Sequence, residues 1–255
     1  MGDFVIWDDF GIPVATTHES VSAVLRSRNM GREVPASKKL SVPQGLEPFY
    51  DLEAHSMLEL EGPTHTRLRG LVLRAFTRNR VSALAPQISM IADDLIDKFP
   101  DGTFDLLQYY ARQLPAITIA RLLGVPDEVA PNLLIWSNAM VAMYQSRRDR
   151  EVEELASKAS QEFSDFLRSY VESRRGNPKD DLISQLIAAE ENGERLSTDE
   201  LISTCILLLN AGHEATVHSI GNAVKHLVDF PRRKDALSPD HIEYAVEECF
   251  RFDPP

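Results

Sequence analysis

The sequence has 255 residues, 43% of them hydrophobic, which is enough for a sizeable buried core. Its formal net charge of −12 argues against a general nucleic-acid binder. Apolar runs are far shorter than the roughly 20 residues that cross a bilayer, and the start, MGDFVIWDDF, carries no export signal. We therefore expect a cytoplasmic globular protein with no membrane or nucleic-acid partner.

The first predicted element is a short β-hairpin, because the segments FVIW and IPVATT flank turn-like residues at 8–11. Thr16 and Glu19 fit a capping box before a helix that ends near Leu25. Residues 30–62 are rich in Pro, Gly and Ser and predict a long loop with little regular structure.

Helical patterns occupy most of the remaining chain, separated by breakers such as Gly124-Val125-Pro126. They cover about 64–77, 81–99, 108–123, 129–146, 150–175, 180–190, 198–229 and 239–252. Since no internal repeat or convincing linker interrupts them, we predict one mainly α domain over residues 1–255 with a small β element.

The longest predicted helix starts at a capping box made by Ser197 and Glu200 and ends before Pro231. It contains LLLNAGHEATVHS, where a stripe of small residues including Gly212 and Thr216 lies beside Ala211 and Ala215. This stripe suits either a closely packed second helix or a flat ligand. Thr216 can hydrogen-bond the Gly212 carbonyl, which predicts a local distortion.

Polar residues form a second stripe on this helix, at Asn210, Glu214 and His218. This stripe is as consistent with a solvated polar edge of the helix as with a functional site. A zinc-protease site does not fit, because His213 and His218 are five residues apart, which turns them away from a shared face.

A basic island lies between Gly62 and Ala92, which contains arginines but no Asp or Glu. His65 and Arg69 lie one helical turn apart there, and Val72, Leu73 and Phe76 continue their face as an apolar surface. Such a face suits a largely apolar ligand with carboxylates, because arginine holds carboxylate in a bidentate fork. An amphipathic surface helix with solvated arginines is the alternative.

The last predicted helix lies in SPDHIEYAVEECFRFDPP, with Ser238 as its cap and Pro239 at its first position. Glu248 and Arg251 are three residues apart and can pair on one face. Cys205 and Cys249 lie in helical patterns, where buried thiols are expected rather than a disulfide framework.

Taken in order, HTRLR, AGHEAT and EECFR followed by DPP resemble the bacterial cytochrome P450 family of haem-thiolate monooxygenases. The resemblance extends over this whole chain but not over the whole family fold. It implies that His65 and Arg69 hold the propionates of haem b, iron protoporphyrin IX. It also implies that Ala211, Gly212 and Ala215 lie beside the oxygen-binding face of the haem.

The resemblance further makes Glu214 the acid that brings protons to the oxygen-activation site, and Glu248 with Arg251 a structural pair that locks the haem-side core. The sequence departs from the family at Ala215, where the family usually has threonine. Thr216 comes one residue later, about 100° further around the helix, so it need not replace that hydroxyl.

The second departure concerns the axial ligand, because the thiolate-bearing segment of the family lies beyond the glutamate–arginine helix. We expect that carboxy-terminal segment, with its axial cysteine, to be absent from this chain, since neither Cys205 nor Cys249 is in that motif. The chain alone is then not a complete monooxygenase.

For the intact protein the resemblance implies insertion of one oxygen atom from dioxygen into a lipophilic small molecule. A ferredoxin or flavoprotein would supply electrons, and an acidic ferredoxin would dock on the arginine island. Two other functions remain open, namely a non-catalytic helical module that binds a ligand or partner, and hydrolysis at a metal site.

Overall fold

The computed structural model describes residues 4–7, 11–145, 148–191 and 193–255. The chain divides into two compact units, unit 1 over residues 1–39 and unit 2 over residues 40–255. The single domain predicted for residues 1–255 stays a prediction.

Unit 1 contains the predicted hairpin, in which β1 (Phe4–Trp7) pairs antiparallel with β2 (Ile12–Ala15). The predicted turn falls mostly at 8–10, outside the described residues. The next helix is α1 (His18–Arg26), followed by the 3₁₀ turn η1 (Ala36–Lys38). The predicted Thr16–Glu19 capping box is wrong by one residue, because Thr17 caps α1 and exchanges hydrogen bonds with Ser20.

Unit 2 is mainly helical. Its elements are, in chain order, α2 (Glu47–Glu53), α3 (Gly62–Ala75), α4 (Arg78–Ala83), α5 (Ala85–Ile96), the π-helical turn η2 (Leu107–Ala111), α6 (Gln113–Leu123), η3 (Asp127–Val129), α7 (Ala130–Val141), η4 (Ala142–Tyr144), α8 (Arg150–Gly176), α9 (Leu182–Ala188), the paired strands β3 (Glu190–Glu191) and β4 (Glu194–Arg195), α10 (Thr198–Asp229), α11 (Arg233–Ala236) and α12 (Ile242–Phe252).

The predicted helix bounds agree best with the structure where capping residues mark the ends of a helix. α10 has the predicted bounds, and its capping box at Ser197 and Glu200 is present. The predicted helix 81–99 is instead two helices, because the chain turns before Pro86 and starts α5 there. The loop predicted over 30–62 contains α2, a helix that sequence reasoning missed.

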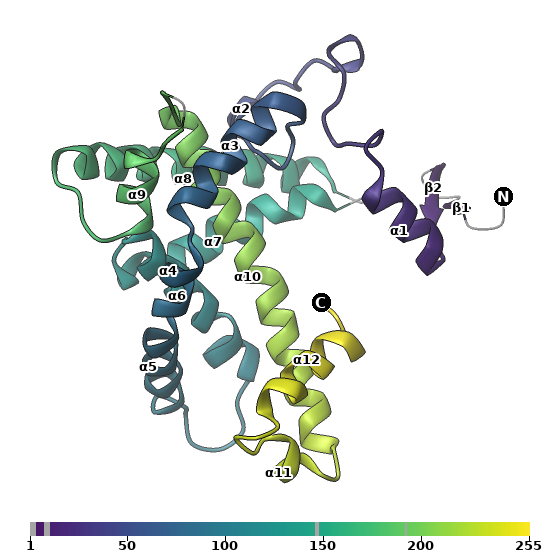
Figure 1. Cartoon of the computed structure of the whole chain (residues 1–255), viewed down its shortest axis with the longest axis vertical. Helices are drawn as coiled ribbons and strands as arrows, with labels where there is room; N and C mark the ends of the chain where they lie inside the picture. The colour runs from purple at the N-terminus through teal and green to yellow at the C-terminus, as the bar shows by residue number, and fades with distance from the viewer. Residues whose placement is uncertain (1–3, 8–10, 146–147, 192) are drawn as a thin grey trace. The chain divides into compact units, whose positions relative to one another are not determined.

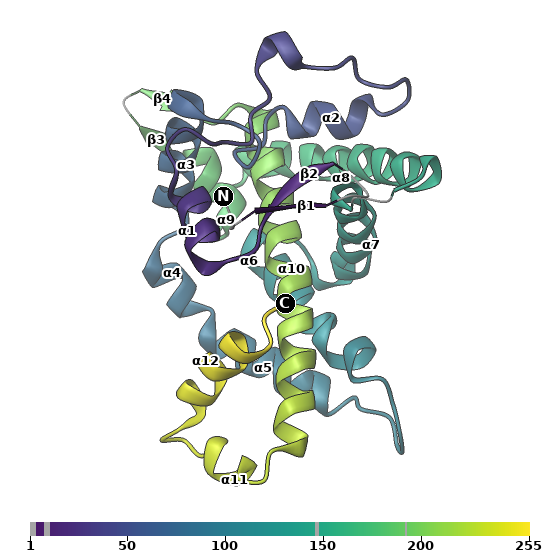
Figure 2. The same cartoon turned by 90° about the vertical axis from the view of Figure 1, so that its right-hand side faces the viewer.

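The core of unit 2 contains buried residues of α2, α3, α6, α7, α8, α9 and the first half of α10 (Figures 1 and 2). Phe163 and Leu167 of α8 are fully buried, as is Leu133 of α7. The Trp136 ring stacks on Phe163 with centroids 5.1 Å apart. The helices α6 to α9 therefore support the first half of α10.

A buried ion pair joins three of these helices at their ends. Arg174 Nε of α8 lies 2.8 Å from Asp181 Oδ2, and Asp181 also caps α9 through the Ser184 N–H. A second Arg174 nitrogen donates to the Gly124 carbonyl at the end of α6. Gly124 has φ 84°, and a Cβ there would lie 2.3 Å from Asp181, so only glycine fits.

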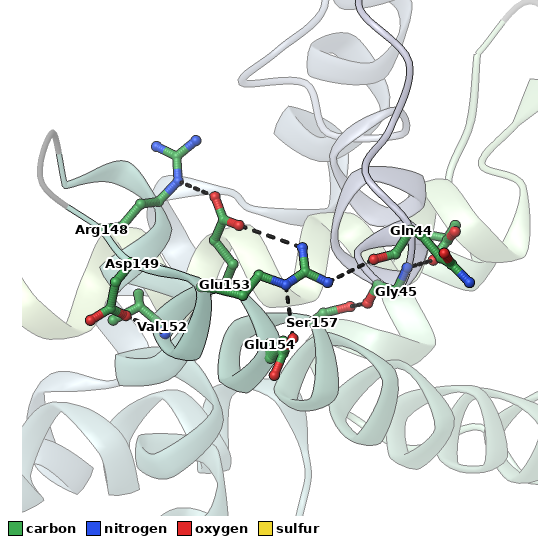
Figure 3. A network of polar contacts seen from close by, with 10 residues as sticks. Gln44, Gly45, Arg148, Asp149, Val152, Glu153, Glu154 and Ser157 are labelled. Carbon is green, nitrogen blue, oxygen red and sulfur yellow. Dashed lines mark hydrogen bonds and ion pairs between the residues drawn. The ribbon is translucent and has the colours of Figure 1, made fainter.

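The segment before α2 is tied to the start of α8 by a polar network, shown in Figure 3. Arg150 Nη2 donates to the Gln44 carbonyl at 2.7 Å, and Ser157 Oγ donates to the Gly45 carbonyl at 2.8 Å. The next residue, Leu46, is fully buried. This part of the predicted loop is therefore anchored on α8.

The second half of α10 carries α11 and α12 (Figure 2). His226 Nε2 lies 2.7 Å from Asp253 Oδ2, just after α12. The three helices enclose a mostly apolar groove of about 630 Å³, yet no residue of α12 is buried. Within the described residues, no helix has the length and apolar character that a membrane span requires.

Candidate functional site

The helix α10 changes character at its midpoint. Before it, every residue from Leu201 to Ile206 is buried. After it, Ala211, Ala215 and Thr216 are exposed, whereas Leu209, His213 and Val217 on the other side are buried. The middle of α10 therefore presents an open face on which the alanines extend no side chain beyond Cβ.

Gly212 lies at the edge of this open face and contacts another helix. A Cβ at Gly212 would be 3.1 Å from Ile119 Cδ1 of α6. The small-residue stripe therefore has two parts. Gly212 allows α6 to approach closely, whereas Ala211 and Ala215 leave the face of α10 open. A role for Gly212 beside a cofactor stays a prediction.

Thr216 makes the predicted hydrogen bond, donating from Oγ1 to the Gly212 carbonyl at 2.8 Å. α10 nevertheless runs as a continuous α-helix from Thr198 to Asp229, so this bond does not interrupt the helix. The hydroxyl keeps its lone pairs free to accept a hydrogen bond at the open face.

Glu214 and His218 form the polar edge of the open face. His218 Nε2 lies 3.8 Å from Glu214 Oε1, and the two side chains are 59% and 47% exposed. The Glu214 carboxylate can therefore exchange protons with water. Among the described residues no group of three or more His, Cys, Asp or Glu side chains could hold a metal ion.

His65 and Arg69 lie on α3, His65 half-buried and Arg69 exposed. Within the part of the chain that the structure describes, neither the imidazole nor the guanidinium has a protein partner. The apolar continuation of this face is only partly as predicted, because Val72 is buried in the core whereas Leu73 is 57% exposed. The pair is thus a cationic group available to a ligand.

Arg67, between them, faces another direction and is engaged. Its Nη1 donates to Glu200 Oε2 at 3.4 Å, and its Nε lies 3.5 Å from Glu194 Oε2. Burial alone raises the pKa of Glu200, but the hydrogen bonds from Arg67 and Ser197 outweigh it and lower the pKa. Sequence reasoning missed this link, through which α3 is joined to the start of α10.

Glu248 and Arg251 pair as predicted, through two hydrogen bonds of 2.7 Å each. These bonds lower the pKa of Glu248 and raise that of Arg251. Both side chains are exposed, so here the pair lies on the surface of α12. The predicted cap is wrong: α12 starts at Ile242 after His241, because Ser238 instead bonds the Asp235 carbonyl and the His241 ring.

Neither cysteine is prepared to act as a thiolate. Cys205 is fully buried in the core, and burial raises its pKa to about 12. Cys249 on α12 is partly exposed, and burial together with the Glu248 charge raises its pKa as well.

Comparison with known proteins identifies the family. The family described as Cytochrome P450 matches residues 126–241. The polyketide biosynthesis cytochrome P450 PksS of Bacillus subtilis is 36% identical over 94% of this chain and 59% of its own length. The vitamin D(3) 25-hydroxylase of Pseudonocardia autotrophica is 37% identical over 90% of this chain and 54% of its own length.

Solved structures agree with the sequence comparison. P450BioI, in complex with an acyl carrier protein that carries hexadec-9Z-enoic acid, matches 99% of this chain and 65% of its own with a TM-score of 0.89 at 27% identity. The structure of PksS matches 94% of this chain and 59% of its own with a TM-score of 0.79 at 35% identity. The chain thus spans between half and two thirds of the length of these proteins. The chain belongs to the cytochrome P450 family.

The family implies a haem cofactor, and the residues of this P450 chain fit that group. His65 and Arg69 are hydrogen-bond donors without protein partners, as propionate binding requires. Ala211 and Ala215 leave an open face on α10 against which a flat ring can lie. That neither Cys205 nor Cys249 is the axial ligand stays a prediction.

Proposed function

We propose that this chain forms part of a haem-dependent monooxygenase that inserts one oxygen atom of dioxygen into a lipophilic small molecule. The observation that carries the proposal is the open, alanine-lined face in the middle of α10, which follows directly on an enclosed first half. The names of the relatives, which include a hydroxylase and a monooxygenase, support the same reaction class.

In this proposal His65 and Arg69 hold the haem propionates, and Ala211, Gly212 and Ala215 lie along the ring. Charge-assisted bonds from α3 would fix the orientation of haem b, because they are stronger than neutral ones. When bound, the haem supplies the redox chemistry of dioxygen, with an axial cysteine that we assign to neither Cys205 nor Cys249.

Glu214 is the proposed proton donor of the reaction. Its carboxylate is 47% exposed and one residue from the alanine-lined face, so it can take a proton from water and turn toward the ligand side. The Thr216 hydroxyl donates to the Gly212 carbonyl and can accept a hydrogen bond from a water at the open face. We infer that water links these two groups.

The substrate is proposed only as a class. The names of the relatives cover polyketide biosynthesis and vitamin D(3) hydroxylation, so they point to no single substrate. The electron donor is proposed as a ferredoxin or flavoprotein. Arg78 has no partner among the described residues, so an acidic ferredoxin could use this part of the basic island. A cytoplasmic location is also part of the proposal.

The absorption spectrum of the reduced, carbon-monoxide-treated protein tests the proposal. A haem with a thiolate ligand gives a strongly red-shifted Soret band, which we expect from the intact protein, with its axial cysteine and haem bound. Haem without that band contradicts the proposal. That result would favour the non-catalytic binding module, which the relatives do not favour. Stoichiometric zinc without haem would instead indicate metal hydrolysis.

A further inference from the structure

Two polar side chains on the buried side of α10 lack hydrogen-bond partners. Among the described residues, buried side-chain atoms without a partner are Ser137 Oγ, Asn210 Oδ1 and both ring nitrogens of His213. Asn210 and His213 are three residues apart, so their side chains are neighbours on the helix surface. Because an unsatisfied buried polar group is costly, two in adjacent positions require an explanation.

His213 faces the junction of α10 with η2 and α6, and it is only 3% exposed. Burial lowers the pKa of His213, and the Arg112 and His218 charges act in the same direction. The Glu214 carboxylate and the Arg112 backbone raise it, though less. An effect of that sign comes from a carbonyl, so the Arg112 carbonyl lies near the ring, outside hydrogen-bond geometry.

The backbone is irregular where η2 meets the start of α6. η2 is a π-turn in which the Arg112 N–H donates to the Leu107 carbonyl, five residues back. Pro115 has no N–H, so the carbonyl of the fully buried Ala111 cannot receive the regular helical hydrogen bond. π-turns of this kind are frequent at functional sites.

We propose that this junction is a buried water-binding site, in which His213 and Asn210 share an ordered water with the carbonyl groups at the start of α6. Water fits better than an ion because the groups are neutral and include both hydrogen-bond donors and acceptors. A neutral imidazole offers one donor and one acceptor, whereas Asn210 Oδ1 and the carbonyls only accept. A buried water typically makes about three hydrogen bonds to such groups.

The water joins α10 to η2 and α6 at the same turns that carry Ala211 and Glu214. It therefore helps to set the position of the open face. The proposal does not depend on the proposed function, because it concerns the interior of unit 2 and needs no cofactor.

The substitution His213→Phe tests the site through the sign of its effect. If the junction holds water, the phenyl ring removes a partner of the water and leaves Asn210 and the carbonyls unsatisfied, so the urea midpoint falls. If the junction is dry, the same substitution removes an unpaired polar group and raises the midpoint. His213→Gln keeps a donor and an acceptor, so its midpoint should stay nearer the wild type.

Oxygen-17 magnetic relaxation dispersion counts long-lived internal waters and gives the independent measurement. We expect one fewer long-lived water in His213→Phe than in the wild type. The matched control is His218→Phe on the exposed side of α10, which should keep the wild-type number. An unchanged number of waters in His213→Phe overturns the proposal, whatever the change in stability.

Discussion

Two regions of unit 2 each contain an arginine–carboxylate ion pair, but the two pairs differ in burial and in the number of helices that they join. At the α6–α8–α9 junction, the Arg174 and Asp181 side chains are 8% and 5% exposed, and their contacts join three helices. On α12, the Arg251 and Glu248 side chains are 70% and 58% exposed and bond only each other in this structure. The first pair stabilises the packed core, whereas the second lies on an open surface.

The same contrast divides α10. Its first half is enclosed by α6 to α9, whereas the face around Ala211 and Ala215 is open. The enclosed half also buries polar residues such as Ser203 and Thr204, so the open face is distinguished by its exposure and its small side chains. We expect substitutions in the packed region to change stability and substitutions in the open region to change function.

The largest expected effect is on the buried pair. Asp181→Ala leaves the Arg174 charge buried without its partner and removes the cap of α9, so we expect a loss of about 3–5 kcal/mol in the free energy of unfolding. Urea denaturation measures it. Glu248→Gln is the matched control in the open region, and its midpoint should be indistinguishable from the wild type. Similar losses for both would erase the contrast between the two regions.

A smaller effect is expected on cofactor binding. His65→Ala combined with Arg69→Ala removes two donors that no described protein group uses, so haem affinity should fall about 10- to 100-fold with little change in stability. Haem titration followed by absorption measures it. Arg78→Ala, an exposed arginine of α4 without a partner among the described residues, should bind haem normally. Normal retention by the double variant returns α3 to the role of an amphipathic surface helix.

Glu214→Gln should affect the reaction without affecting the packing. The side chain is 47% exposed, so the fold tolerates the change, while the loss of a proton donor should slow turnover about tenfold or more. Substrate affinity, measured from the spectral shift on binding, should stay constant. Wild-type turnover in this variant would remove Glu214 from the proton path.

The smallest effect concerns pH. Because the pKa of His213 is lowered from 6.5 in the folded state, the unfolded chain binds a proton that the folded chain does not, once the pH falls below about 6.5. The contribution of His213 therefore destabilises the fold progressively as the pH falls from 6.5 to its lowered pKa. Urea midpoints at several pH values measure it. His213→Phe should flatten this part of the profile, and an unaltered profile would show that His213 is not the group responsible.

Local signals in the sequence predicted α10 well. Ser197 and Glu200 satisfy the first N–H groups of the helix, and Pro231 follows its end, so both limits depend on residues within one turn. The split between α4 and α5 was missed, since the apolar spacing does not change at the break. The helix α2 was missed because the Pro, Gly and Ser content of residues 30–62 predicted a loop. The Arg174–Asp181 pair could not be predicted, because burial of both charges depends on how α6, α8 and α9 pack.

The chemistry of the candidate site stays a prediction, and its geometry depends on packing that the sequence does not show. The spacing of His65 and Arg69 within one turn indicated a carboxylate-binding face. Gly212 contacts Ile119 of α6 whereas Ala211 faces outward, and the two residues differ by about 100° around the helix. Sequence alone could not tell which of these directions α6 would cover.

The central claim is that haem lies on the open face of α10, and haem titration of an Ala211→Trp variant tests it most directly. Ala211 is exposed, so an indole there fills the face without disturbing the core. Ala83→Trp places the same ring on an exposed position of α4 and serves as the control. We predict saturable one-to-one haem binding by the wild type and Ala83→Trp, and little or none by Ala211→Trp. Equal binding by all three proteins, or no haem binding by the wild type, would contradict the claim.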